Sequence, residues 1–105
     1  MEIRYLLGGT KLNETEKKYI ESKIDKTKKL LSGYEENELG GEVELEIDKK
    51  GFFRVEVMIR TPHNLYRVEK ISDSLMNAVD MMDEALTKQI RREREKTRDT
   101  RRRGK

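Results

Sequence analysis

The chain has 105 residues, of which 43% are charged and 33% are apolar. That length supports one domain with a modest core. Cysteine is absent, which excludes disulfides and thiolate chemistry and suits a reducing compartment. Because no apolar run could span a bilayer and no secretory signal is found, we expect a cytoplasmic protein without membrane contact.

The positive charge is concentrated in two segments, although the net charge is only +3. Residues 91–105 hold nine basic and three acidic residues, and residues 11–32 hold seven basic and four acidic residues. Residues 33–90 instead hold thirteen acidic and seven basic residues. Such segregation favours docking on a polyanion. A solvated surface with a disordered tail is the alternative.

The N-terminal part of the chain predicts a strand followed by a helix. Apolar residues alternate over residues 3–7, which is typical of a strand. Asn13 and Glu16 then form a capping-box pattern, and the apolar spacing behind them predicts a helix over 14–32. The acidic segment 34–41 predicts a loop.

Three further strands follow. A period of two over 43–47 and 53–59 predicts a hairpin whose turn lies at residues 48–51, with Gly51 where a positive φ is needed. Glu and Arg side chains on the polar faces of these strands are expected to pair across them. Residues 65–70 predict a shorter fourth strand.

The last helix has the clearest periodicity. Ser72 or Asp73 is its predicted cap, and its core stripe comprises Leu75, Val79, Met82, Leu86 and Ile90. No apolar residue follows this stripe. We therefore expect a folded domain over 1–95 and a basic, disordered tail over 96–105.

The predicted order is β-α-β-β-β-α, an α+β fold. A right-handed crossover makes the first two strands parallel, and the later strands form an antiparallel meander. The result is a four-stranded mixed sheet with both helices packed on one face and a wet opposite face.

Catalysis is poorly supported. His63 is the only histidine and lies in a predicted turn. Asp80, Asp83 and Glu84 share one side of the last helix, but exposed carboxylates of this kind are usually solvated. No glycine-rich phosphate-binding motif occurs. We expect no enzymatic activity, metal, cofactor or small-molecule substrate.

Binding is better supported, because cations line one side of the last helix. At the helical repeat they form a stripe that we expect to face away from the core: Lys88, Arg91, Arg94, Arg98 and Arg102. Guanidinium groups suit phosphates, and residues 91–105 hold no aromatic side chain for base stacking. We expect recognition of the backbone of folded, mostly double-helical RNA.

Three segments carry a family pattern. They are residues 12–31 (LNETEKKYIESKIDKTKKLL), 67–69 (RVE) with 73–80 (DSLMNAVD), and 86–92 (LTKQIRR). They resemble the bacterial ribosome hibernation-promoting factors, which include the ribosome-associated inhibitor protein Y. The resemblance covers about residues 1–95 and suggests a short member or the N-terminal domain of a long one.

The resemblance implies a translation inhibitor that binds the small ribosomal subunit in its decoding channel. There it blocks messenger and transfer RNA and stores idle ribosomes in stress or stationary phase. The family pattern implies contacts to ribosomal RNA from Lys23, Lys26, Lys29, Lys88, Arg91 and Arg92. Arg94 and Arg98 are predicted to contact ribosomal RNA only because they lie in the stripe of cations on the last helix.

Three alternatives remain open at this point. One is a general double-stranded-RNA-binding module. Another is an interaction protein whose acidic sheet meets a basic partner through Glu42, Glu44, Glu46 and Glu56. An enzyme is the remote third. The residues do not decide whether the protein holds single ribosomes or promotes their pairing, nor the oligomeric state of the free chain.

Overall fold

The structure is a computed structural model that describes the backbone of residues 1–103 and the side chains of residues 1–96. The elements are β1 (Glu2–Gly8), α1 (Glu14–Leu30), a 3₁₀ turn (Glu36–Glu38), β2 (Gly40–Ile47), β3 (Phe53–Arg60), β4 (Leu65–Ser72) and α2 (Leu75–Arg103). The predicted order β-α-β-β-β-α is confirmed. No helix within the described residues is long and apolar enough to cross a membrane.

The sheet has the predicted mixed topology. Its strand order is β1-β2-β3-β4, with β1 parallel to β2 and the other neighbours antiparallel. The β2–β3 hairpin turns at Gly51, whose φ of +88° lies in the left-handed region that favours glycine. Asp48 stabilises this turn, because its Oδ1 accepts hydrogen bonds from the backbone N–H groups of Lys50 and Phe52, both at 2.9 Å.

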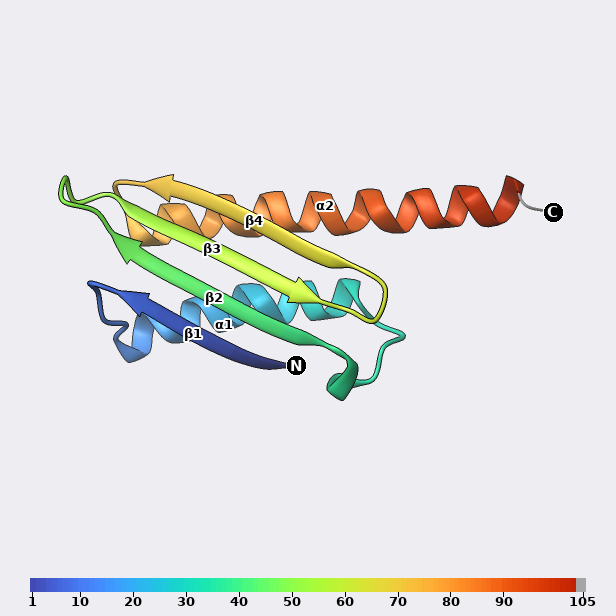
Figure 1. The fold of residues 1–105 in the computed structure, drawn as a ribbon, viewed down its shortest axis with the longest axis horizontal. Coiled ribbons are helices and arrows are strands. Elements are labelled where there is room, and N and C mark those ends of the chain that lie inside the picture. Colours follow the sequence, from blue (N-terminus) through green and yellow to red (C-terminus); the bar gives the residue numbers. More distant parts are fainter. Residues whose placement is uncertain (104–105) are drawn as a thin grey trace.

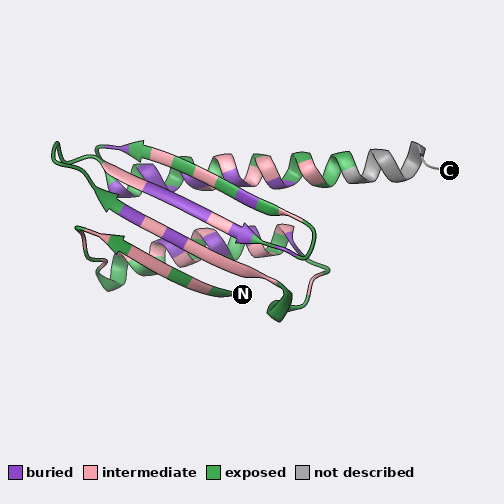
Figure 2. Ribbon diagram, viewed as in Figure 1, coloured by how far each residue is buried: buried purple, intermediate pink, exposed green. Residues whose placement is uncertain are grey.

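Both helices lie on the same face of the sheet (Figure 1), as predicted. The core lies between the helices and the sheet, and the buried strand residues are concentrated on the two central strands, β2 and β3 (Figure 2). The whole predicted stripe of α2 is buried, together with Ile20, Ile24, Leu31, Val43, Leu45, Val55, Val57 and Ile59. No helix of the described residues covers the opposite face of the sheet (Figure 1). This layering leaves the outer sides of the two helices as a separate surface.

Helix α1 begins as predicted and ends slightly earlier. The capping box is complete: the backbone N–H of Glu16 donates to Asn13 Oδ1 at 2.8 Å, and the N–H of Asn13 donates to Glu16 Oε1 at 3.1 Å. The last helical residue is Leu30, with Leu31 as C-cap, rather than residue 32. The end of this helix becomes important for the site, because its carbonyl groups face a side chain of α2.

Strand β2 begins inside the predicted loop, which corrects that prediction. Gly40 and Gly41 have no side chains to continue the apolar alternation, so the sequence signal starts only at Val43. Their backbones nevertheless pair on both sides, Gly40 lying opposite Glu2 of β1 and Arg60 of β3. Strand pairing therefore extends the element beyond its side-chain pattern.

The cap of α2 also differs from the prediction. Helix α2 begins at Leu75, so neither Ser72 nor Asp73 immediately precedes it. The N–H of Asn77 donates to Ser74 Oγ at 3.3 Å, which makes Ser74 the capping residue. Ser72 ends β4, and its Oγ accepts a hydrogen bond from Asn77 Nδ2 at 2.8 Å. Residues 72–74 are all polar residues that commonly cap helices, so the sequence pattern could not identify which of them is the N-cap.

Helix α2 continues past the end of the sheet (Figure 1), and the longest dimension of the molecule is 54 Å. The boundary that we predict between a domain of residues 1–95 and a tail of 96–105 stays a prediction.

Candidate nucleic-acid interface

The two helices run side by side in the same direction (Figure 1), so cations from both meet on one layer of the molecule. Arg91 and Arg94 of α2 line a shallow hollow with Leu30, the last residue of α1. Within the described part of the chain, the exposed helix cations whose side chains make no hydrogen bond, ion pair or contact with an aromatic ring are Lys18, Lys26, Lys29, Arg91 and Arg92. We call these five residues the free cations.

Four of the eight predicted contact residues are therefore free and exposed: Lys26, Lys29, Arg91 and Arg92. Lys88 is exposed as well, but its Nζ lies 3.3 Å from Glu84 Oε1 one helical turn earlier. Both side chains are about 70% exposed, so this pair contributes little and opens readily. The side chains of Arg98 and Arg102 lie outside the described residues, and their placement stays a prediction.

Lys23 is held between the helices rather than free. Its Nζ lies 3.6 Å from Asp80 Oδ1 of α2 and 5.2 Å from the centre of the Tyr19 ring. The hydroxyl of Tyr19 donates to the same carboxylate of Asp80. These three residues form the Tyr19–Asp80–Lys23 cluster, which joins α1 to α2. The charge of Lys23 is thereby directed at a carboxylate.

The cluster shifts the protonation of its members. The hydrogen bond to Asp80 raises the pKa of Tyr19, and burial and the Asp80 charge add to that rise. Burial alone would lower the pKa of Lys23, but Tyr19, Asp80 and Asp83 raise it by more, so the net shift is upward. At neutral pH the tyrosine is therefore a proton donor and the lysine is charged.

Arg94 corrects the expectation that the whole stripe faces away from the rest of the fold. Its guanidinium donates to the carbonyl oxygen of Leu30, and its Nη2 donates to the carbonyl oxygen of Ser32 at 3.3 Å. These carbonyls lie at the C-terminal end of α1, where the helix dipole favours a cation. Arg94 follows Ile90 by one helical turn, which places it on the side of α2 that adjoins α1.

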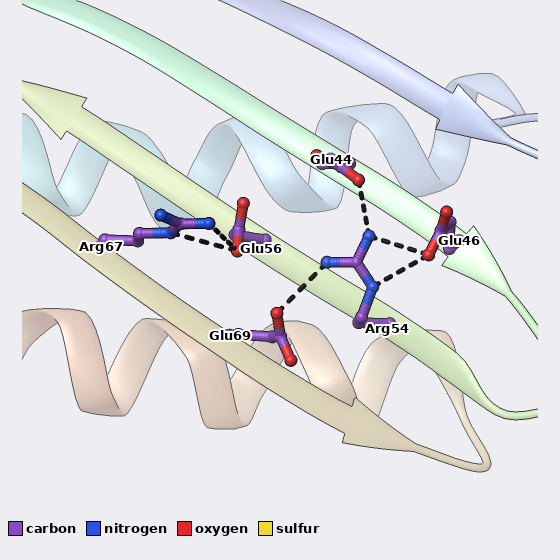
Figure 3. Close-up of polar contacts among 6 residues, drawn as sticks. All are labelled: Glu44, Glu46, Arg54, Glu56, Arg67 and Glu69. Carbon is purple, nitrogen blue, oxygen red and sulfur yellow. Dashed lines mark hydrogen bonds and ion pairs between the residues drawn. The ribbon is translucent and has the colours of Figure 1, made fainter.

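The open face of the sheet has the opposite character (Figure 3). Arg54 binds three carboxylates, those of Glu44 at 2.5 Å, Glu46 at 2.8 Å and Glu69 at 3.3 Å. Hydrogen bonds to Glu44 and Glu46 raise the pKa of Arg54. Arg54 lies directly opposite Glu46 and pairs with it, so the predicted cross-strand pairing is confirmed at this position, whereas Glu44 lies opposite Glu56.

Carboxylates outnumber arginines in this part of the sheet. Glu56 lies opposite Glu44 on one side and Glu69 on the other, and it binds Arg67 at 3.0 Å. Opposed like charges destabilise a sheet, and the two arginines offset part of that repulsion. A polyanion is therefore attracted to the helix layer rather than to this face.

The residues considered for metal binding or catalysis are exposed or already engaged with neighbours. His63 is exposed in the β3–β4 turn, and Asp80 is engaged with Tyr19 and Lys23. In the described part of the chain no group of three or more His, Cys, Asp or Glu residues could hold a metal ion. The chemistry that this surface offers is fixed positive charge.

Comparison with known families decides the relationship. The family model described as "Sigma 54 modulation protein / S30EA ribosomal protein" matches residues 8–98, most of the chain. The chain belongs to this family. Membership in the sigma 54 modulation/S30EA family confirms the resemblance seen in the three sequence segments. A comparison with curated proteins finds no match.

Solved structures agree with this family assignment. The crystal structure of the Thermus thermophilus Protein Y N-terminal domain is 27% identical, with a TM-score of 0.74, and the match covers 88% of this chain and 98% of that one. A ribosomal subunit interface protein from Coxiella burnetii is 18% identical, with a TM-score of 0.71 and coverage of 90% and 98%. The second likeness shows the shared fold.

The contact of Arg94 with α1 predicts a measurable loss of stability. Arg94→Ala removes a cation and two hydrogen bonds from the helix end, so we expect the free energy of unfolding to fall by about 1 kcal/mol. Arg91→Ala is the matched control, because its side chain is free, and we expect a change within about 0.5 kcal/mol. Urea unfolding followed by circular dichroism measures both. Equal losses would contradict the contact.

The Tyr19–Asp80–Lys23 cluster predicts a change in tyrosine titration. Because Asp80 raises the pKa of Tyr19, Asp80→Ala should let Tyr19 ionise at lower pH. Because the pKa of Tyr19 is raised in the folded protein, the hydrogen bond to Asp80 stabilises the fold at pH values below the ordinary tyrosine pKa of about 10. That stabilisation is lost as the pH rises through the pKa of Tyr19 in the folded state. Ultraviolet titration of tyrosinate measures the shift, and Tyr19→Phe identifies the transition.

Asp83→Ala is the control for this titration, because Asp83 acts on Lys23 but not on the phenol of Tyr19. If Tyr19 ionised at the same pH in Asp80→Ala as in the wild type, the hydrogen bond between Tyr19 and Asp80 would be contradicted.

Proposed function

We propose that this protein binds the small ribosomal subunit and inhibits translation by occupying the decoding channel, so that messenger and transfer RNA cannot enter. Membership in a family whose name includes a ribosomal protein supports association with ribosomes. The structural likeness to the Thermus thermophilus Protein Y N-terminal domain supports it as well. The protein would act in the cytoplasm, on idle ribosomes in stress or stationary phase.

The observation that carries this proposal is the difference in charge between the helix layer and the open sheet face, where the exposed arginines Arg4 and Arg60 lie among more numerous carboxylates. The free cations lie on the two helices, while the open sheet face holds a surplus of carboxylates around Arg54. Phosphate contacts release counterions and supply most of the affinity for a nucleic acid. Such a molecule approaches RNA with its helix layer first.

The spacing between the helices gives the interface its shape selectivity. One row of cations could bind any phosphate backbone, but two rows held at a fixed separation fit only certain arrangements of phosphates. The Tyr19–Asp80–Lys23 cluster and the contact of Arg94 with Leu30 hold that separation. We therefore assign Lys23 and Arg94 mainly to positioning.

Direct phosphate contacts are assigned to residues whose charge is available. These are Lys26, Lys29, Arg91 and Arg92, with Lys88 after its weak pair opens, and Arg98 by continuation of the stripe. Inhibition in this account involves no chemical step. It is reversible competition for space, and it weakens as salt displaces the phosphate contacts.

Substituting the free cations tests this assignment. Lys26→Ala and Arg91→Ala should each weaken binding to purified small subunits and reduce the slope of log affinity against log salt by about one unit. Lys49→Ala, at an exposed lysine of the β2–β3 hairpin, should change neither quantity. Cosedimentation over a range of salt concentrations measures both quantities.

If the double variant Lys26→Ala/Arg91→Ala kept its affinity for the small subunit and its salt slope, these helix cations would not be the residues that contact RNA phosphates. A free RNA hairpin that competes as well as the small subunit would instead indicate a general double-stranded-RNA-binding module.

A further inference from the structure

A second group of cations lies on the other side of α2, along the edge strand β4. A shallow groove runs between the two elements, which lie next to each other (Figure 1). Val68 and Ala85 contribute apolar wall, and the groove's cations come from both elements: Arg67, Lys70, Lys88 and Arg92. We call this the β4–α2 groove. Three of its cations, Arg67, Lys70 and Lys88, belong to neither predicted basic segment.

The groove's only lining carboxylate within the described residues is already engaged. Glu69 Oε2 lies 3.3 Å from Arg54 Nη1 on the open sheet face, and because Arg54 also binds Glu44 and Glu46, it offsets only part of the Glu69 charge. Arg67 pairs with Glu56 at 3.0 Å but remains 62% exposed. Its guanidinium can therefore keep that pair and still meet a ligand. The lining of the groove therefore holds four cations and one carboxylate, a local excess of positive charge.

Lys70 is the most informative of these residues. Strand β4 alternates, and Lys70 shares the side of Tyr66 and Val68, which pack toward the helices. It is partly buried, and within the described residues its amine has no ion pair or hydrogen bond. A lysine that points toward the helix layer without a carboxylate partner leaves its charge available to an anion in the groove.

We propose that the β4–α2 groove is a second phosphate-binding surface, which holds the backbone of one RNA strand. This inference rests on the proposed function and extends it to residues outside the helix faces. The groove is continuous with the first surface, because Lys88 and Arg92 of α2 belong to both. Helix α2 is then contacted by RNA on two sides, at its outer face and beside β4.

The test uses Lys70→Gln, which removes the charge and keeps most of the alkyl stem. Small-subunit binding should weaken about fivefold at low salt, and the salt slope should fall by about one unit. Lys49→Gln is the matched control, and Lys70→Arg should retain wild-type affinity because it retains the charge. If Lys70→Arg loses as much affinity as Lys70→Gln, the residue acts through packing and the proposal is wrong.

The remaining outcomes separate this inference from the proposed function. If Lys70→Gln behaves as Lys49→Gln while Arg91→Ala binds weakly, the groove is not used and the proposed function stands. If the wild-type protein fails to bind small subunits, the proposed function fails. In that case, fluorescence anisotropy with a short RNA duplex tests the groove. Equal affinity of Lys70→Gln and Lys49→Gln for the duplex would overturn the groove proposal, and weaker binding by Lys70→Gln would support it.

Discussion

The polar contacts between the two helices are the constraint on which the proposed interface depends. Near the start of α2, Asp80 binds Tyr19 and Lys23 of α1. In the second half of α2, Arg94 binds the carbonyl groups at the end of α1. The contacts lie more than one helical turn apart on both helices, so they fix orientation as well as distance. Two rows of cations with a fixed separation can recognise the shape of folded RNA, whereas loosely joined helices could not.

These contacts also divide the cations by role. Lys23 and Arg94 are directed at oxygen atoms within the protein, while Lys26, Lys29 and Arg91 have no such partner among the described residues. The carboxylates around Arg54 and Arg67 give the opposite face its acidic surplus. The molecule is therefore electrostatically two-sided, and its small net charge of +3 hides this asymmetry.

Local patterns predicted much of the fold and only part of the site. The capping box at Asn13, the hairpin at Gly51 and the buried stripe of α2 all depend on residues within a few positions of one another, and the structure confirms them. The misjudged feature was Arg94, because a helical wheel gives its angle but not the position of the α1 terminus, 62 to 64 residues away. The cluster at Asp80 and the role of Lys70 likewise depend on neighbours that only the fold brings together.

Competition with the natural ligands of the decoding channel tests the central claim most directly. The measurement is cosedimentation of the protein with purified small subunits, with and without messenger RNA and initiator transfer RNA. The account predicts saturable binding of a single copy per subunit, and displacement when both ligands are added. Binding that saturates but ignores the two ligands would contradict occupation of the channel, and binding that never saturates would contradict a defined site on the subunit.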